Sequence, residues 1–127
     1  MSSYKSEKII IRKNDEDLFN ILTEFENLKN FLPPNIEKFE VFGETCVLKI
    51  ANLPEIKLNI HEKISNKFVC YSASESPVPF LMKSFIQKID NNTCHLIFEI
   101  DVELNLMTKM MLDKPIKSFI NQIMVFK

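Results

Sequence analysis

The final stretch of the chain, residues 104–127, has its apolar residues at helical spacing. They recur every three or four positions, which places them along one stripe of a helix, and polar residues such as Lys109 and Gln122 fall outside it. The spacing predicts a long amphipathic helix, with Pro115 either kinking it or, with Asp113 as a cap, opening a second helix; we favour the kink. The stripe consists of Leu112, Ile116, Phe119, Ile120, Ile123 and Phe126.

Near the other end of the sequence, a short strand is followed by a second helical pattern. The β-branched run Ile9-Ile10-Ile11 within Lys8 to Arg12 predicts the strand. Asn14 lies three residues before Asp17 in the manner of a capping box. An apolar stripe then continues to Pro33-Pro34, which cannot carry a helix onward. One helix, or two shorter ones separated near Glu26 or Asn27, fits this pattern.

Between the two helical regions the hydrophobic period changes to two, which predicts strands. Gly43-Glu44, Ser65-Asn66 and Asn91-Asn92 are short connections typical of hairpins. None of the connections is long enough for a parallel crossover, so the sheet is predicted to be antiparallel. The predicted strands are Ile36 to Phe42, Thr45 to Ala51, Glu55 to Ile64, Lys67 to Ser74, Leu81 to Ile89 and Thr93 to Leu104.

The last predicted strand alternates apolar and mostly polar residues along its whole length, so the sheet has one dry face. A sheet of about seven strands with one apolar face must be covered, and the two helical regions are the available cover. A strongly twisted sheet curls, and a curled sheet around one long helix leaves an apolar cavity unless side chains fill it. The fold class is therefore α+β: a curved antiparallel sheet wrapped around a long C-terminal helix, with two short helices after the first strand.

Candidate ligand-binding residues follow from these phases. Extending the inward phase of Ile56, Leu58 and Ile60 places Glu62 on the apolar face, where it would orient a polar ligand group or act as a general base, unless it lies at a wet strand end. Cys70 and Ser72 are placed in the same cavity as weak polar contacts. The apolar lining candidates, which would equally suit a filled core, are Phe85, Phe98, Ile100, Met107, Met110, Met111, Phe119 and Ile120.

Composition narrows the function classes. The 127 residues are 46% hydrophobic, which suits a single domain over 1–127. The 16 basic and 17 acidic residues nearly balance, and Arg12 is the only arginine, so nucleic acid is not expected as a partner. Gly43 is the only glycine, which excludes glycine-rich nucleotide-binding loops.

Metal, redox and membrane functions receive no support from the sequence. Cys46, Cys70 and Cys94 form no C-x-x-C pair, and His61 and His95 fall on the polar phase of their strands. We therefore expect no metal, no cofactor and no catalytic residue. The polar N-terminus and the lack of a membrane-length apolar run predict a cytoplasmic protein without a transmembrane segment, and leave a homodimer possible.

The order of elements resembles the helix-grip fold of the START-like (SRPBCC) superfamily. The most specific similarity is the hairpin Ser84 to Leu104 that runs into Leu106 to Ile120, which resembles small bacterial members labelled polyketide cyclase/dehydratase. The resemblance covers the whole chain and implies a helix gripped by the sheet. Because this superfamily includes transport, sensing and catalysis, the resemblance implies little about function.

Three functions remain as hypotheses. The first is binding, transport or sensing of a small hydrophobic molecule, such as a lipid, a quinone or a polyketide-like compound, and we favour it. The second is an enzyme of the polyketide cyclase/dehydratase type, against which the lack of an inward histidine or acid–base pair counts. The third is a protein-interaction module with a filled core.

Overall fold

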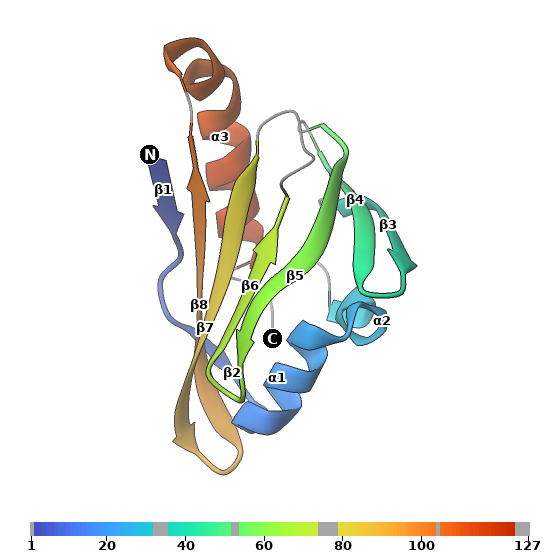
Figure 1. Ribbon diagram of the computed structural model, residues 1–127. Coiled ribbons are helices and arrows are strands. Elements are labelled where there is room, and N and C mark those ends of the chain that lie inside the picture. The colour runs from blue at the N-terminus through green and yellow to red at the C-terminus, as the bar shows by residue number, and fades with distance from the viewer. Residues whose placement is uncertain (1, 32–35, 52–53, 74–78, 104, 124–127) are drawn as a thin grey trace.

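The computed structural model describes residues 2–31, 36–51, 54–73, 79–103 and 105–123. Its strands form one curved antiparallel sheet, with α1 and α2 covering one end of the inner, concave face and α3 lying along the other (Figure 1). The elements are β1 (Ser2–Lys5), β2 (Ile9–Ile11), α1 (Asp15–Thr23), α2 (Phe25–Leu28), η1 (Lys29–Phe31), β3 (Ile36–Phe42), β4 (Thr45–Ile50), β5 (Ile56–Ile64), β6 (Phe68–Ser72), β7 (Phe80–Asp90), β8 (Thr93–Val102) and α3 (Leu106–Ile123).

The sheet has eight strands, whereas the sequence predicted about seven. The strand order is β1-β8-β7-β6-β5-β4-β3, and β2 also pairs with β8. The additional strand is β1, whose Tyr4 lies opposite Ile100 of β8. The strand was missed because Ser2–Lys5 contains one aromatic residue among polar ones and shows no apolar alternation. Both N-terminal strands therefore share β8, the longest apolar–polar alternation in the chain.

The first helical region is divided into α1 and α2 at Glu24, whose backbone is extended. The predicted cap is confirmed, because Asn14 Oδ1 accepts a hydrogen bond from the Asp17 backbone N–H at 2.7 Å. Leu18, Leu22 and Phe25 are buried against the sheet. The break lies slightly before the position that the sequence suggested, and Pro33-Pro34 lie outside the described residues.

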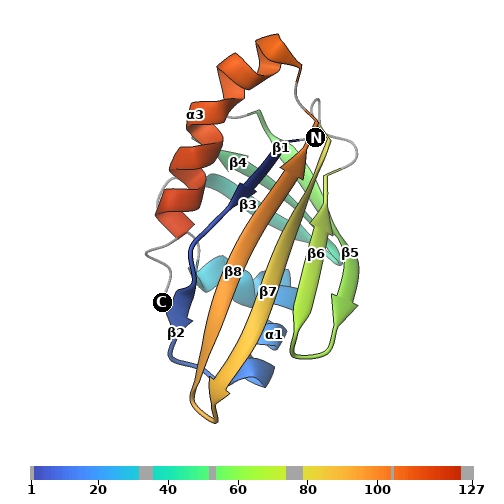
Figure 2. The same cartoon turned by 90° about the vertical axis from the view of Figure 1, so that its left-hand side faces the viewer.

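The C-terminal helix α3 is one helix with Pro115 inside it, not two. Two reciprocal hydrogen bonds cap its first turn. Asn105 Oδ1 accepts from the Thr108 N–H at 2.8 Å, and Thr108 Oγ1 accepts from the Asn105 N–H at 3.0 Å. In Figure 2 its first turns are inclined to the rest. Such a bend suits a proline that has no N–H for the carbonyl of Met111.

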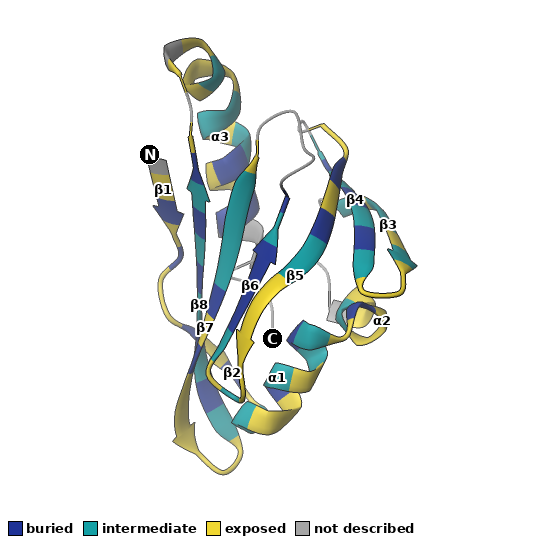
Figure 3. Cartoon of the chain, viewed as in Figure 1, coloured by how far each residue is buried: buried dark blue, intermediate teal, exposed yellow. Residues whose placement is uncertain are grey.

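The core lies between the concave face and the helices (Figure 3). Along β8, every second residue from Cys94 to Val102 is buried, as predicted. Gly43 has a φ of +66° in the β3–β4 turn, the left-handed conformation that glycine adopts most easily. The sequence-predicted α+β fold, a curved antiparallel sheet around a long C-terminal helix, is confirmed.

Candidate functional site: an apolar cavity

A cavity of about 60 Å³ lies between the concave face of the sheet and α3. It sits where β4 and β8 end and β5 and β7 begin, the end of the sheet nearest the first half of α3 (Figure 1). Every described side chain that lines it is apolar. The lining residues are Leu48, Ile50, Pro54, Ile56, Leu58, Phe80, Met82, Ile100, Val102, Leu112, Ile116 and Phe119.

Strand pairing explains why these side chains meet. Met82 lies opposite Ile100 and Phe80 lies opposite Val102, so two neighbouring rungs of β7 and β8 face the cavity. Leu48 and Ile56 form a corresponding pair on β4 and β5. On the side of the cavity opposite the sheet, the lining comes from α3. It contributes Leu112, Ile116 and Phe119, which follow one another at helical spacing.

Among the described residues of the lining there is no titratable side chain that would compensate a buried charge. Transferring an ionised molecule into such a space is strongly unfavourable without a partner. By contrast, an apolar molecule would lose only its contact with water.

Two polar side chains lie deeper on the concave face, on neighbouring strands. The Tyr71 hydroxyl donates a hydrogen bond to the Leu22 carbonyl near the end of α1, and burial raises the pKa of Tyr71 far above its usual value. Ser84 is fully buried, and its Oγ has no hydrogen-bond partner among the described residues. Tyr71 is therefore satisfied, whereas Ser84 is a lone hydroxyl among apolar groups.

A small polar network fastens α3 beside the cavity. The Tyr4 hydroxyl of β1 donates to Asp113 Oδ1 at 2.7 Å, and Lys117 Nζ lies 3.0 Å from Asp113 Oδ2. Burial, followed by the hydrogen bond to Asp113, raises the pKa of Tyr4 to about 12. The Tyr4 hydrogen bond and then Lys117 lower the pKa of Asp113. Because Asp113 directly follows Leu112, the network holds the helix in place where it lines the cavity.

Four of the predicted site residues lie on the cavity side of the molecule. Ile100 and Phe119 line the cavity. Phe98 and Ile120 are buried in the core but are not part of the lining. The β8 alternation and the helical stripe thus each indicated one residue that lines the cavity.

The predicted inward position of Glu62 is wrong. A bulge interrupts the pairing of β5 and β6 between Ile60 and Glu62, so Ile60 lies opposite Tyr71 but Glu62 lies opposite Cys70. An extra residue in a strand reverses the side on which the following side chains lie. Glu62 is consequently exposed on the outer, convex face.

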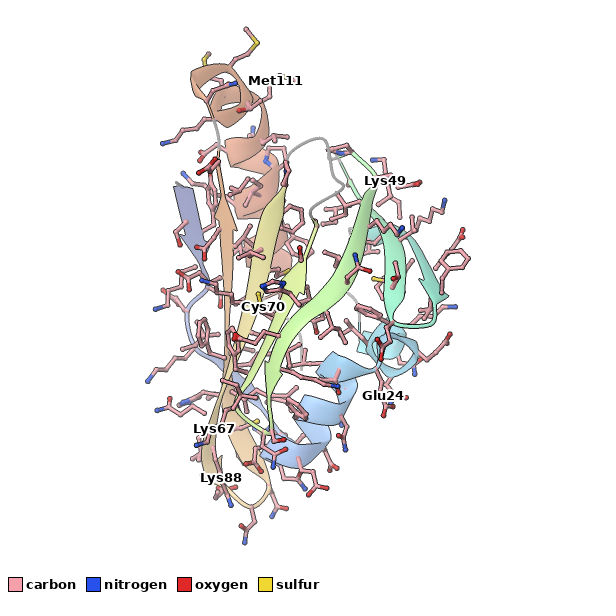
Figure 4. All side chains as sticks on the ribbon, in the orientation of Figure 1. Glu24, Lys49, Lys67, Cys70, Lys88 and Met111 are labelled. Carbon is pink, nitrogen blue, oxygen red and sulfur yellow. The ribbon has the colours of Figure 1, made fainter. Side chains whose placement is uncertain are left out.

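Cys70, Ser72 and Phe85 also lie on the convex face. On β6 the inward residues are Val69 and Tyr71, which join the core, so the phase assigned to Cys70 and Ser72 is reversed. Cys70 is nevertheless buried, and burial raises the pKa of its thiol. Figure 4 shows Cys70 midway along the sheet. Phe85 packs against Phe68 with ring centroids 5.1 Å apart.

The three predicted methionines lie outside the cavity. Met107, Met110 and Met111 are 71%, 78% and 68% exposed on the first turns of α3. They were grouped with the lining because methionine suits adaptable apolar surfaces. They lie on the side of the helix opposite Leu112 and Ile116, so none of them reaches the sheet.

Sequence reasoning missed most of the lining on β4, β5 and β7. Leu48 and Ile50 alternate with polar residues on β4, and Ile56 and Leu58 do so on β5. This signal was present, but it does not tell which rungs lie under the helix. Phe80 and Met82 begin a strand that follows Pro77 and Pro79 in the sequence, and their phase follows only from their pairing with β8.

Neither a metal site nor a membrane span is found in the described part of the chain. No group of three or more histidine, cysteine, aspartate or glutamate side chains is arranged to hold a metal ion among the described residues. None of the described helices is long and apolar enough to cross a membrane.

Comparison with known proteins places the fold. No protein-family model matches the chain, and no curated protein matches it in sequence. Among solved structures, a START superfamily protein from Mycobacterium smegmatis is 12% identical, with a TM-score of 0.65 over 95% of this chain and 98% of that one. The fold is START-like.

Two further structures share this START-like fold. XoxI from Bacillus cereus is 14% identical, with a TM-score of 0.68 over 98% of this chain and 94% of that one. Norcoclaurine synthase from Thalictrum flavum, solved in complex with dopamine and hydroxybenzaldehyde, is 10% identical, with a TM-score of 0.68 over 97% and 84% of the two chains. At these identities the similarity establishes the fold, and the resemblance predicted from the sequence is confirmed at that level.

Proposed function

We propose that this protein binds a small, uncharged apolar molecule in the cavity between the sheet and α3. The observation that carries the proposal is the cavity itself, which is lined by twelve apolar side chains, with no titratable group among the described residues of its lining. Ligand pockets in proteins are predominantly apolar in the same way. The superfamily resemblance agrees with this role but does not identify the ligand.

The size of the cavity favours a compact ligand. At about 60 Å³, it has room for several water-sized groups, because one such group needs about 10–15 Å³. A ligand that buries roughly 300 Å² of apolar surface gains about 7 kcal/mol at about 25 cal/mol per Å². Association costs at least about 4 kcal/mol of this gain. The remaining gain, about 3 kcal/mol, corresponds to roughly millimolar affinity, so tighter binding needs an additional polar contact. The cavity size favours a ring or short chain over a whole long-chain lipid.

A cyclase or dehydratase activity receives less support. Norcoclaurine synthase shows that a protein of this fold is an enzyme. General acid–base catalysis needs a titratable group within hydrogen-bonding reach of the substrate, and the described lining supplies none. A filled-core interaction module is likewise less favoured, because the core leaves space under α3.

Native mass spectrometry of the purified protein, followed by organic extraction, tests the proposal. We expect a reproducible small-molecule adduct that is lost in Ile116→Trp, because the larger side chain would occupy the cavity. Met110→Trp is the matched control, since Met110 is on the same helix but exposed. If Met110→Trp removes the adduct as effectively as Ile116→Trp, or if no adduct forms with quinones, fatty acids or aromatic compounds, the cavity is not a binding site.

A further inference from the structure

The first turns of α3 carry an exposed apolar surface, which we call the methionine face. It consists of Met107, Met110 and Met111, each more than two-thirds exposed. These three residues lie on one side of the helix, opposite the stripe that packs on the sheet. Clustered exposed apolar side chains on one helix commonly mark an interaction site, whereas single ones do not.

The helix segment that carries the methionine face has an excess of basic residues. Lys114 is exposed one turn after Met110 and lies on the methionine side, whereas Lys109 is exposed between the methionines in sequence but lies on the side of Leu112. Asp113 is the only acidic residue of α3, and its carboxylate already binds the Tyr4 hydroxyl and Lys117. The described part of α3 thus carries more positive than negative charge, and its acidic side chain is already paired.

The methionine face also lies at the end of the molecule where the cavity is found. In Figures 1 and 2 the first turns of α3 extend past the end of the sheet, and Figure 4 shows Met111 there. Leu112, the residue after Met111, lines the cavity. A surface that covered the methionine face would therefore touch the helix segment that roofs the cavity.

We propose that the methionine face docks on the surface of a membrane that contains anionic lipids. The flexible thioether side chains enter the boundary between head groups and acyl chains. Lys109 and Lys114 belong to the same segment of α3, and each basic residue near the surface adds to the attraction of anionic lipids. An acidic protein would also attract the lysines, but it would need a groove complementary to the projecting apolar side chains. A bilayer accepts such side chains without a preformed groove.

Vesicle flotation of the full chain tests the docking. We expect the protein to float with vesicles of phosphatidylcholine and phosphatidylglycerol and much less with phosphatidylcholine alone, and we expect added salt to release it. Replacing Met107, Met110 and Met111 together with glutamine should abolish flotation. Replacing Lys109 and Lys114 with glutamine should weaken binding roughly fivefold for each lysine.

Ile89→Gln is the matched control, because Ile89 is 48% exposed in the hairpin of β7 and β8 at the opposite end of the sheet. It should float like the wild type. The proposal is overturned if the triple methionine variant floats normally, or if the wild type ignores anionic vesicles. In the latter case, a wild-type dimer that the methionine variant dissociates would show that a second copy occupies the face. The result is independent of the cavity, because flotation needs no ligand.

A second observation, the lone hydroxyl of Ser84, points to the chemistry of the ligand. Ser84 is two residues along β7 from Met82 on the same face, about 6–7 Å further into the molecule. Its neighbours across the sheet are Val69 and Phe98, both apolar. A buried hydroxyl without a partner is unfavourable compared with an apolar side chain of similar size, so its presence here requires another explanation.

Resting on the proposed function, we infer that Ser84 hydrogen-bonds a single polar group at the inner end of the ligand. The ligand is then an apolar molecule with one hydroxyl or carbonyl oxygen, bound with that oxygen inward and its apolar part under α3. Met82, which lines the cavity two residues before Ser84, has a flexible side chain that can make room for such a group.

NMR titrations with 1-hexanol and with n-hexane, which measure the affinity of the protein for each, test this inference. The wild type should prefer the alcohol, and Ser84→Ala should lose about fivefold of that preference. Ser72→Ala, on the convex face of β6, is the control and should keep it. If neither probe binds, the proposed function fails; if both bind and Ser84→Ala keeps the full preference, the inference about Ser84 fails and a bound water satisfies the hydroxyl.

Discussion

The two faces of the sheet are built from the same strands but are covered in different ways. The concave face is covered by helices, and its apolar side chains line a cavity together with those of α3. On the convex face, polar groups pair with one another: Lys83 Nζ lies 2.6 Å from Asp101 Oδ2, and Ser3 Oγ donates to Glu99 at 2.9 Å. The helices exclude water from the whole concave face, whereas the paired long side chains exclude water only locally on the convex face.

The difference matters most for residues that are buried on both faces. Cys70 and Tyr71 are adjacent on β6, and both are almost fully buried. Tyr71 faces the helices, while Cys70 lies beside the Lys83–Asp101 ion pair on the convex face. Burial alone therefore does not identify the side on which a ligand is found.

The largest effect is expected from a pair of neighbouring residues on β8. Leu96 is completely buried in the core, so Leu96→Ala should lower the free energy of unfolding by about 2–5 kcal/mol. Ile97 lies on the convex face and is only partly buried, so Ile97→Ala should cost roughly 1 kcal/mol or less. Urea unfolding of both variants measures the contrast, which equal losses would contradict.

A smaller effect is expected at Tyr71. Its hydroxyl satisfies the carbonyl of Leu22, one of the last carbonyls of α1, which have no partner within the helix. Tyr71→Phe leaves that carbonyl buried without a donor, and should lower the free energy of unfolding by about 1–3 kcal/mol. Cys70→Ala serves as the convex-face control in the same unfolding measurement. A Tyr71→Phe variant as stable as the wild type would show that water reaches the Leu22 carbonyl.

The hydrogen bond between Tyr4 and Asp113, which holds α3 against β1, should make the protein less stable at alkaline pH. The pKa of Tyr4 is raised from 10.0 to about 12 in the folded state, so its neutral form is favoured there. Its contribution is fully present below pH 10 and is lost as the pH rises through about 12. Tyr4→Phe should lack this loss. Unfolding measured across that range tests it, and parallel curves for both proteins would contradict it.

The smallest effect is expected from the convex-face residues that the sequence had assigned to the cavity. Cys70→Ala and Ser72→Ala should leave ligand affinity unchanged, because both side chains are separated from the cavity by the sheet. Isothermal titration with the extracted ligand provides the measurement. A severalfold loss of affinity in either variant would mean that the ligand crosses to the convex face.

Much of the fold was predictable from the sequence because its signals are local and repeated. The alternation of β8, the cap at Asn14 and the stripe of α3 each follow from a fixed period or a short contact. The same signals located Ile100 and Phe119 in the site. Strand β1 was missed because pairing with β8, and not its own composition, makes it a strand.

The rest of the site could not be predicted because it depends on pairing between strands. One bulge near His61 moves Glu62 to the convex face, and the residue pattern of β5 does not predict this bulge. Likewise, β6 is short and buried on both sides, so its phase is fixed by its neighbours β5 and β7. The methionines were assigned to the cavity by type, but their position relative to the end of the sheet leaves them exposed.

Methyl-resolved NMR during titration with the extracted ligand tests the central claim most directly, since it reports on both faces at once. The account predicts shifts for Ile100, Ile116 and Met82, which line the cavity, and none for Ile64 and Ile89, which are exposed elsewhere. Shifts confined to the exposed methyl groups, with those of the cavity unchanged, would contradict it.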